Sequence, residues 1–173
     1  AVKNISDIHA RTLLKQSLER TTIKRAKGKK SKYSPKEKTI YISANAKVDT
    51  MAHELFHEID DSYGLTENGM LGKSVLSDYS RLQNLARGYG KTIQEMLYSR
   101  YPEGISDILH GSSGGSIFLG YGHKARGYWE KERALEKEVF AQYGRIVVNE
   151  NKKVEKMFRE LFPDCWKEIS ETL

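Results

Sequence analysis

Apolar side chains recur every three or four residues over much of the chain, a spacing that predicts amphipathic helices. The segments with this spacing are residues 6–20, 48–63, two stretches within 75–100, 129–148 and 152–173. Ser6 stands where an N-cap would begin the first helix, and Gly64 stands where the second would end. The sequence RGYG interrupts the third pattern, and Pro163 predicts a stop or kink in the last.

The repeat changes to two in the TIYIS sequence of residues 39–43, where two isoleucines alternate with threonine, tyrosine and serine. This is the pattern of a strand with one buried face. Glycine and proline interrupt residues 21–38, which predicts a hairpin or strand pair leading into the helix of residues 48–63. The glycine-dense residues 110–123 predict a strand or loop that exposes its backbone. Helices and strands together predict an α+β fold.

The chain has 173 residues, enough for one domain to bury a core without disulfides. Cys165 is the only cysteine, which excludes an internal disulfide and a multi-cysteine zinc site and is consistent with a reducing compartment. Any metal would be held by histidine and carboxylate. No apolar run approaches the ~20 residues of a membrane helix, so no membrane partner is expected. Because the chain begins at Ala1 without methionine, we expect a domain excised from a longer protein.

Two histidines and a glutamate in TMAHELFHEIDD, residues 50–61, carry the clearest chemical signal. His53 and His57 are four residues apart, so on a helix they lie on one face and can direct imidazole nitrogens at one ion. Glu54 follows His53 and could reach a water at the metal instead of the metal itself. Zinc makes such a water acidic and polarises a carbonyl, and a carboxylate can accept the proton. This HExxH pattern predicts a zinc site with Glu54 as general base.

A catalytic zinc needs a third protein ligand. The close-spaced pattern HExxHxxGxxH is excluded, because Asp60 and Tyr63 occupy its glycine and final histidine positions. Asp61 lies eight residues after His53, about 12 Å along a helix, which is too far to share a metal with both histidines. We expect Asp60 or Asp61 to orient a histidine through its outer nitrogen, with simple helix-end acidity as the alternative.

A carboxylate from a later helix is the remaining source, and ALEKEVFAQ, residues 134–142, offers Glu136 and Glu138. Ala134 and Ala141 lie four residues before and three after Glu138, a small-residue patch that lets another helix approach closely. Glu136 continues a charged face instead. The packing argument selects Glu138 as third ligand, with Glu136 as the second choice and a solvated ion-pair face as the alternative for both.

The other three histidines differ in their surroundings. Nothing in the sequence converges on His9 or His110, which are expected to be ordinary surface or core residues. His123 ends the sequence GYGH, with Tyr121 close before it and Tyr128 soon after. A loop histidine or tyrosine opposite the metal could donate a hydrogen bond to a developing oxyanion. We take His123 first and the two tyrosines as alternatives, although aromatic residues beside glycine are also common in ordinary loops.

The formal net charge is +6, and eight basic residues crowd the segment around the predicted strands. They are Lys24, Arg25, Lys27, Lys29, Lys30, Lys32, Lys36 and Lys38. Such a stripe can contact phosphates. Lysines on an exposed sheet edge also block aggregation, and we favour that interpretation. Tyr33 and Tyr41 could stack on bases, but tyrosine is an ordinary strand residue. Nucleic acid is therefore a possible partner, although not an expected one.

Several of these features together resemble a known family. They are HELFH, the later E-x-F-A of Glu138 to Ala141, and SDIL…GYGH…YW between them. The chain resembles the zincin-like metallopeptidase domain at the C-terminal end of minor head (head morphogenesis) proteins of tailed bacteriophages and prophages. The likeness covers about three quarters of the chain, from TIYIS through the tail that contains FPDCW. One departure is Gln142, where such families often carry an acidic residue after E-x-F-A.

The resemblance implies that His53, His57 and Glu138 bind zinc and that Glu54 is the general base. It also implies a zincin-like fold, with a small mixed sheet packed on the HExxH helix and several further helices. An edge strand within residues 39–43 would line the cleft, and an extended peptide would bind by strand addition.

We therefore expect residues 1–173 to form one zincin-like domain, a zinc-dependent peptidase acting on peptide or protein substrates. Phage or prophage origin would place it in the host bacterial cytoplasm or in the phage particle. Two other classes fit: a non-catalytic head module that zinc stabilises or that contacts nucleic acid, and a mobilised toxin domain. The intact Glu54 favours the enzyme, since a structural zinc site needs no general base. The sequence indicates no oligomeric state.

Overall fold

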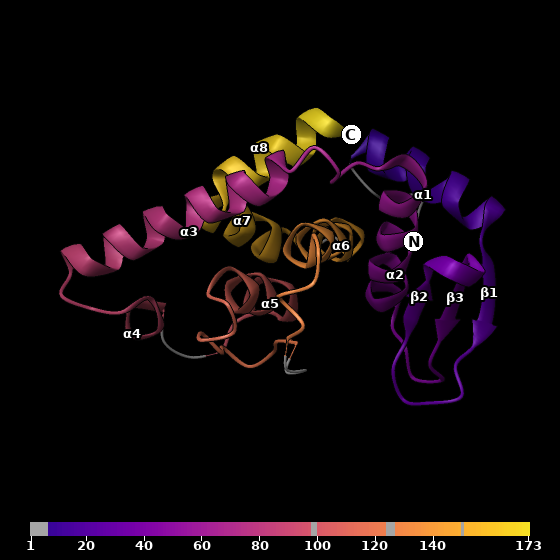
Figure 1. Cartoon of the computed structure of the whole chain (residues 1–173), viewed down its shortest axis with the longest axis horizontal. Helices are drawn as coiled ribbons and strands as arrows, with labels where there is room; N and C mark the ends of the chain where they lie inside the picture. Colours follow the sequence, from indigo (N-terminus) through magenta and orange to yellow (C-terminus); the bar gives the residue numbers. More distant parts are fainter. Residues whose placement is uncertain (1–6, 98–99, 124–126, 150) are drawn as a thin grey trace.

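The computed structural model describes residues 7–97, 100–123, 127–149 and 151–173 (Figure 1). These residues form a mixed α+β fold with a small sheet and eight α-helices. The strands are β1 (Thr22–Arg25), β2 (Lys32–Ser34) and β3 (Thr39–Ile42). The helices are α1 (Ile8–Arg20), α2 (Val48–Tyr63), α3 (Met70–Gly88), α4 (Ile93–Leu97), α5 (Glu103–Ser112), α6 (Ala134–Val148), α7 (Lys152–Leu161) and α8 (Pro163–Thr172). No helix of the described residues is long and apolar enough to cross a membrane.

The sheet has the strand order β1-β3-β2, with β1 parallel and β2 antiparallel to β3. The predicted strand pair before α2 is thus part of a mixed three-stranded sheet. The prediction that residues 39–43 form an edge strand is wrong, because β3 pairs on both sides and β2 is an edge. The central position of β3 agrees with the burial of its residues. The Ile40 side chain is fully buried against the helices, whereas every residue of the edge strand β1 is exposed.

Helices α2 and α6 pack closely against each other and form the middle of the core. Gly144 of α6 makes this possible, because a Cβ there would lie 2.1 Å from Cδ2 of Phe56 on α2. The Phe56 ring also contacts the rings of Phe140 and Tyr143, with centroids 5.1 and 6.0 Å away. Since interiors are packed to near-crystalline density, this close crossing fixes how the two helices face each other. It therefore fixes which polar side chains of α2 and α6 meet each other.

Of the C-terminal helices, α7 packs against α6, and α8 runs along α3 (Figure 1). Asp78 of α3 is buried and accepts a 2.9 Å hydrogen bond from the backbone N–H of Cys165, in the first turn of α8. This carboxylate satisfies a donor that the helix itself leaves free. Burial raises the pKa of the Cys165 thiol well above its ordinary value, so Cys165 is a core residue with little nucleophilic character.

Several predicted boundaries need correction. Asp7 caps α1, its Oδ1 accepting the N–H groups of His9 and Ala10 at 3.0 Å, while Ser6 lies outside the described residues. Helix α3 begins at Met70, five residues before the predicted helical stretch that starts at residue 75. Helix α6 begins at Ala134, five residues later than predicted, because Arg133 before it has left-handed backbone angles with φ 55°.

The sequence before the glycine-dense loop forms α5, a helix that the apolar periodicity did not indicate. Ile105, Ile108 and Leu109 do follow helical spacing, but the segment is short and lies between Pro102 and the glycines that follow it, so the signal is weak. In the structure every residue of α5 after Glu103 is buried, including the polar Ser106 and Asp107. The following residues 113–123 form a loop, in agreement with one of the two forms predicted for them.

Candidate metal centre

Three side chains meet where the middle of α2 faces the first turns of α6. The Nε2 atoms of His53 and His57 are 3.2 Å apart. Glu138 lies across both, with Oε2 3.4 Å from Nε2 of His53 and Oε1 3.5 Å from Nε2 of His57. The HExxH spacing brings the two rings onto one face of α2, and the close crossing brings Glu138 opposite them.

These separations fit a zinc ion. An ion held tetrahedrally at about 2.0–2.1 Å from each ligand atom requires donor atoms about 3.3–3.4 Å apart. The three separations, 3.2, 3.4 and 3.5 Å, lie around that value, with a different carboxylate oxygen of Glu138 facing each histidine. Glu138 is only 4 % exposed, and its Oε2 has no hydrogen-bond donor among the described residues. Because a buried carboxylate oxygen without a partner is costly, the carboxylate itself favours a cation at this point.

The electrostatics of His53 agree with a ligand role. Burial, together with the neighbouring charges of His57 and Arg145, lowers the pKa of His53 well below its usual 6.5. His53 is therefore neutral at physiological pH, and a neutral imidazole has the lone pair that a metal needs. The rings of His53 and His57 meet edge to face, with centroids 4.7 Å apart and planes at 90°.

Glu54 lies beside this group without being part of it. Its side chain is 7 % exposed, and Oε2 accepts a 2.7 Å hydrogen bond from the backbone N–H of Tyr33 on β2. Burial raises the pKa of Glu54 above its usual value, although the charge of His57 and the Tyr33 hydrogen bond oppose the shift. A carboxylate with a raised pKa is a better proton acceptor than an exposed one. Strand β2 thus holds the candidate base in place.

All four residues line one cleft of about 500 Å³, whose walls come from β2, α2, the start of α6 and the segment around His123 and Tyr128. The strand along this cleft is β2, where the sequence had indicated residues 39–43. The side chain of Tyr33 also turns toward α2, since its hydroxyl donates to Oδ2 of Asp61 at 2.7 Å. The cleft leaves room beside the three donor atoms, as a catalytic metal site requires.

His123 stands across from the histidine pair and is held by a chain of buried polar groups. Its Nδ1 is 3.0 Å from Oδ1 of Asp107 on α5, and Oδ2 of Asp107 accepts a 2.8 Å hydrogen bond from Nε2 of Gln142 on α6. The Nε2 atom of His123 lies 3.9 Å from Oε1 of Glu138. Burial alone would lower the pKa of His123, but Asp107 and Glu138 outweigh it and raise the pKa above 6.5. The raised pKa favours the protonated form of His123 beside Glu138.

Asp107 is the residue that sequence reasoning missed as part of this cluster. It belongs to the SDIL sequence that carries part of the family resemblance, and that was the available signal. Its neighbour Ser106 fastens the same loop: Oγ donates to the carbonyl of Tyr121 at 2.7 Å and accepts from its N–H at 3.0 Å. Asp107, His123 and Glu138 also offer donor atoms within 4.8 Å of one another. Two sets of residues could thus hold an ion, and the set with His53 and His57 is the one that the sequence predicted.

The surroundings of Gln142 explain why this chain has glutamine where the resemblance would favour an acidic residue. Gln142 is fully buried, and its side-chain amide donates a hydrogen bond to the carboxylate of Asp107. We expect Gln142→Glu to place two buried carboxyl groups together, so that they share a proton and lose stability as the pH rises. The free energy of unfolding should fall by about 1–3 kcal/mol at pH 8 and by less at pH 5. Urea unfolding at both pH values tests this.

The matched control is Gln94→Glu, an exposed glutamine on α4. It introduces the same charge and should change stability by no more than about 0.5 kcal/mol at either pH. A loss in Gln142→Glu that does not depend on pH would contradict the shared-proton explanation.

The two tyrosines considered as oxyanion donors lie differently. The Tyr128 hydroxyl donates a short hydrogen bond to Oε1 of Glu138, and its ring stacks on His123 at 4.1 Å with planes 9° apart. Burial, then the charge of Glu138, raises the pKa of Tyr128, so it stays a hydroxyl donor. Tyr121 packs edge-on to His123 and does not line the cleft, and burial raises its pKa to about 12.

The remaining candidates lie away from the metal group. The prediction that Asp60 or Asp61 orients a histidine is wrong: Asp60 accepts from the N–H and hydroxyl of Thr66 at 2.8 and 2.9 Å, and Asp61 binds Lys38 Nζ at 2.6 Å. The helix-end acids instead hold the chain on either side of α2.

Glu136, the second choice for the third ligand, lies against α3, where a Cβ on Gly72 would meet its Oε1 at 2.2 Å. His110 is buried, with Nδ1 2.8 Å from the carbonyl of Ile117. His9 is exposed on α1. None of these three residues reaches the cleft that holds the α2 histidines.

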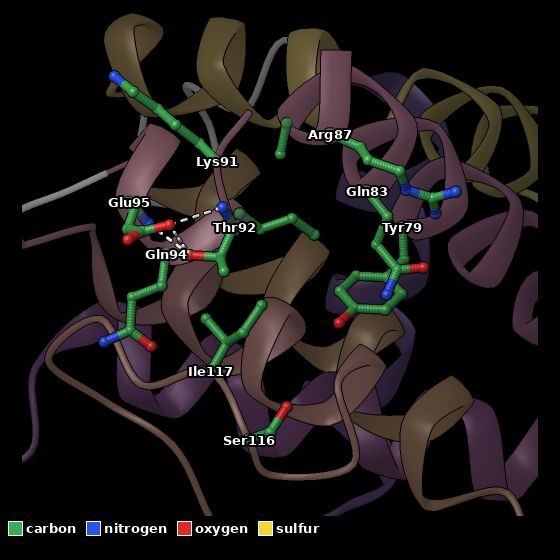
Figure 2. Close-up of a pocket in the computed structure, with 11 residues that line it drawn as sticks. Tyr79, Gln83, Arg87, Lys91, Thr92, Gln94, Glu95, Ser116 and Ile117 are labelled. Atoms are coloured by element: carbon green, nitrogen blue, oxygen red, sulfur yellow. Dashed lines mark hydrogen bonds between the residues drawn. The ribbon is translucent and has the colours of Figure 1, made fainter. Parts of the chain in front are cut away.

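A second hollow, of about 570 Å³, lies between the end of α3, α4 and residues 116–117 (Figure 2). Figure 2 shows Thr92 and Glu95 joined by hydrogen bonds that cap α4, with Ile117 opposite. Its lining contains one carboxylate and no histidine. It therefore offers neither a metal site nor a general base with a metal, and the chemistry belongs to the first cleft.

No family model, no curated protein and no solved structure matches this chain. The metal centre must therefore be judged on its own geometry, and the family resemblance stays a prediction.

Proposed function

We propose that this chain is a zinc-dependent peptidase that hydrolyses a peptide bond with Glu54 as general base. One observation carries the proposal. Donor atoms of His53, His57 and Glu138 lie 3.2–3.5 Å apart in a cleft where a further carboxylate, Glu54, is held separately by β2. Hydrolysis by an activated water requires a set of metal ligands with a carboxylate beside them that does not bind the metal.

Zinc, when bound, supplies a Lewis acid that polarises a carbonyl and makes a water more acidic. The protein's own residues do the rest. Glu54 accepts the proton of the attacking water and later gives it to the leaving amine, a transfer that its raised pKa favours. His123, held by Asp107, donates a hydrogen bond to the oxygen that becomes negative, while the Tyr128 hydroxyl is already donated to Glu138.

The substrate is proposed to be an extended peptide that lies along the outer edge of β2. In an antiparallel pair the backbone groups of successive residues point alternately toward and away from the partner strand. The N–H of Tyr33 points to Glu54, so the carbonyl of Tyr33 also faces away from β3, toward the cleft. An incoming strand can hydrogen-bond to that carbonyl and so bring its peptide bond beside Glu54. A protein of phage or prophage origin is the substrate class that the resemblance supports.

A purely structural zinc site would be closed by a fourth protein ligand and would have no use for a base. The open cleft of about 500 Å³ and the separate anchoring of Glu54 support the enzyme over this alternative. A non-catalytic head module or a toxin domain therefore has less support than a peptidase.

The proposal predicts that cleavage of an unstructured protein depends on zinc. Protein stripped with a chelator should leave the test protein intact, and one equivalent of zinc should restore cleavage by at least about a hundredfold. Fragment masses by mass spectrometry measure the rate and identify the bonds. Magnesium is the control metal, because it prefers six oxygen ligands and does not suit two imidazoles. Equal cleavage in the stripped, zinc and magnesium samples would reject the proposal.

A further inference from the structure

We propose that the solvent-facing side of the sheet binds single-stranded nucleic acid, and that this binding needs no metal ion. The first observation is the separation of charge along the chain. Residues 21–47 hold nine of the 29 lysines and arginines but only one of the 23 acidic residues, so they carry a formal +8 while the rest carries −2. All the net positive charge thus lies on the sheet and its connections, at one end of the molecule (Figure 1).

The strand register organises part of this charge into a row. Tyr41 in the centre of the sheet pairs with Lys24 on one side and Lys32 on the other. The next row, with Ile40 in the centre, faces the core. Because neighbouring residues of a strand point to opposite faces, Lys24, Tyr41 and Lys32 lie together on the face turned away from α2.

The sequence alone could not show this arrangement, because the same lysines on an edge hairpin would only discourage aggregation. With β3 in the centre, the aromatic ring lies between two cations on an open face. The Nζ atom of Lys32 is 5.5 Å from the centroid of the Tyr41 ring. A phosphate drawn to Lys32 therefore brings its base within reach of that ring, and base–aromatic stacking is the common device of proteins that bind single strands.

The cations of this surface are available to a ligand. Among the described residues, no carboxylate lies within ion-pair distance of Lys24, Lys27, Lys29, Lys30 or Lys32, whereas Lys38 is paired with Asp61. Three of the free lysines lie on the loop that joins β1 to β2 and extend the row beyond the sheet.

Glu37 is the one acidic residue in this region. Its carboxylate accepts the Tyr41 hydroxyl at 2.8 Å, and hydrogen bonds from Tyr41 and Ser34 together with the charges of Lys24 and Lys32 lower its pKa. The surface therefore already attracts one anionic group. A phosphate would compete with that carboxylate for the same cations, so removal of the Glu37 charge should strengthen binding.

An acidic protein segment is the other polyanion that this surface could attract. It would supply negative charge but no flat ring for Tyr41, while a single strand supplies both. A duplex keeps its bases stacked inside and cannot use the ring either. The combination of free lysines and an aromatic residue in one row therefore favours the single strand.

The test is fluorescence anisotropy of a labelled 20-nucleotide oligothymidine titrated with the full chain, with chelator present so that the metal centre plays no part. Lys24→Gln/Lys32→Gln should weaken binding roughly tenfold at 0.1 M salt and lower the slope of log K against log salt by about 1.4, which is 0.7 for each lost phosphate contact. Tyr41→Leu should weaken it about fivefold or more through lost stacking. Glu37→Gln should tighten it about twofold.

The matched control is Lys153→Gln/Lys167→Gln, which removes the same charge from exposed lysines on α7 and α8. It should change affinity by less than about twofold, and circular dichroism should show that all variants fold. Equal losses in the two double variants would mean that only net charge matters, and the proposal would fail. It would also fail if labelled polyglutamate bound as tightly as the oligonucleotide and with the same dependence on Tyr41.

Discussion

Glu54→Gln is expected to reduce the rate of peptide cleavage by about 10²–10⁴-fold, the range that a positioned general base contributes. The amide cannot accept the proton of the attacking water. It has the same shape, however, and its oxygen can still accept the hydrogen bond from the backbone of Tyr33. Glu54 is also not one of the three residues whose donor atoms lie at ligand separations. The variant should therefore fold and bind zinc like the parent protein.

The measurement compares cleavage of several unstructured proteins by zinc-loaded parent and variant, with zinc content measured on the same samples. Glu132→Gln is the matched control, because Glu132 lines the same cleft, is exposed, and loses the same charge. It should keep at least about half of the parent activity. If both variants cleave as fast as the parent across the whole panel, the peptidase proposal is lost.

The helices that the sequence predicted best are those with a strong local signal at their ends. Helix α2 was predicted over residues 48–63 and has those bounds, because an apolar stripe runs into Gly64, whose φ of 64° only glycine adopts easily. Pro163 likewise separates α7 from α8 as predicted. In both cases a single residue type restricts the backbone, so no tertiary information is needed.

The sheet topology and α5 could not be predicted in the same way. The parallel pairing of β1 with β3 joins residues 17 positions apart, and nothing in either short strand specifies its partner. Helix α5 has only ten residues, and a helix this short depends on the packing around it rather than on its own apolar period. Both features depend on what surrounds the segment, which only the folded chain provides.

The candidate site shows the same division. His53, Glu54 and His57 lie on one helix, so their spacing alone indicated a common face. Glu138 came from a packing argument on small residues, and the close crossing of α2 and α6 agrees with that reasoning. Asp107 lies 16 residues before His123 and joins it only because the following loop folds back on α5, so its place in the SDIL sequence was the one signal for it.

Removal of Glu138 is expected to abolish most zinc-dependent stabilisation of the protein. A ligand that binds only the folded state stabilises it by RT ln(1 + [L]/Kd), about 4 kcal/mol at a free concentration of 1,000 Kd. For a chain of this size that corresponds to a rise in the unfolding midpoint of roughly 8–16 °C. The parent protein should show this rise when zinc is added. Glu138→Ala should show only a small fraction of it, because two histidines alone hold the ion weakly and leave it open to solvent.

Two further variants make the result specific to the carboxylate. Glu138→Gln keeps an acceptor for the Tyr128 hydroxyl and nearly the same volume, so it separates loss of the charged ligand from damage to the packing. It should also lose most of the zinc response. Glu136→Ala removes the neighbouring carboxylate, which lies beside Gly72 of α3, and should respond to zinc like the parent. A full zinc response in both Glu138 variants would mean that the ion lies elsewhere. The converging atoms of α2 and α6 would then be an ordinary buried contact.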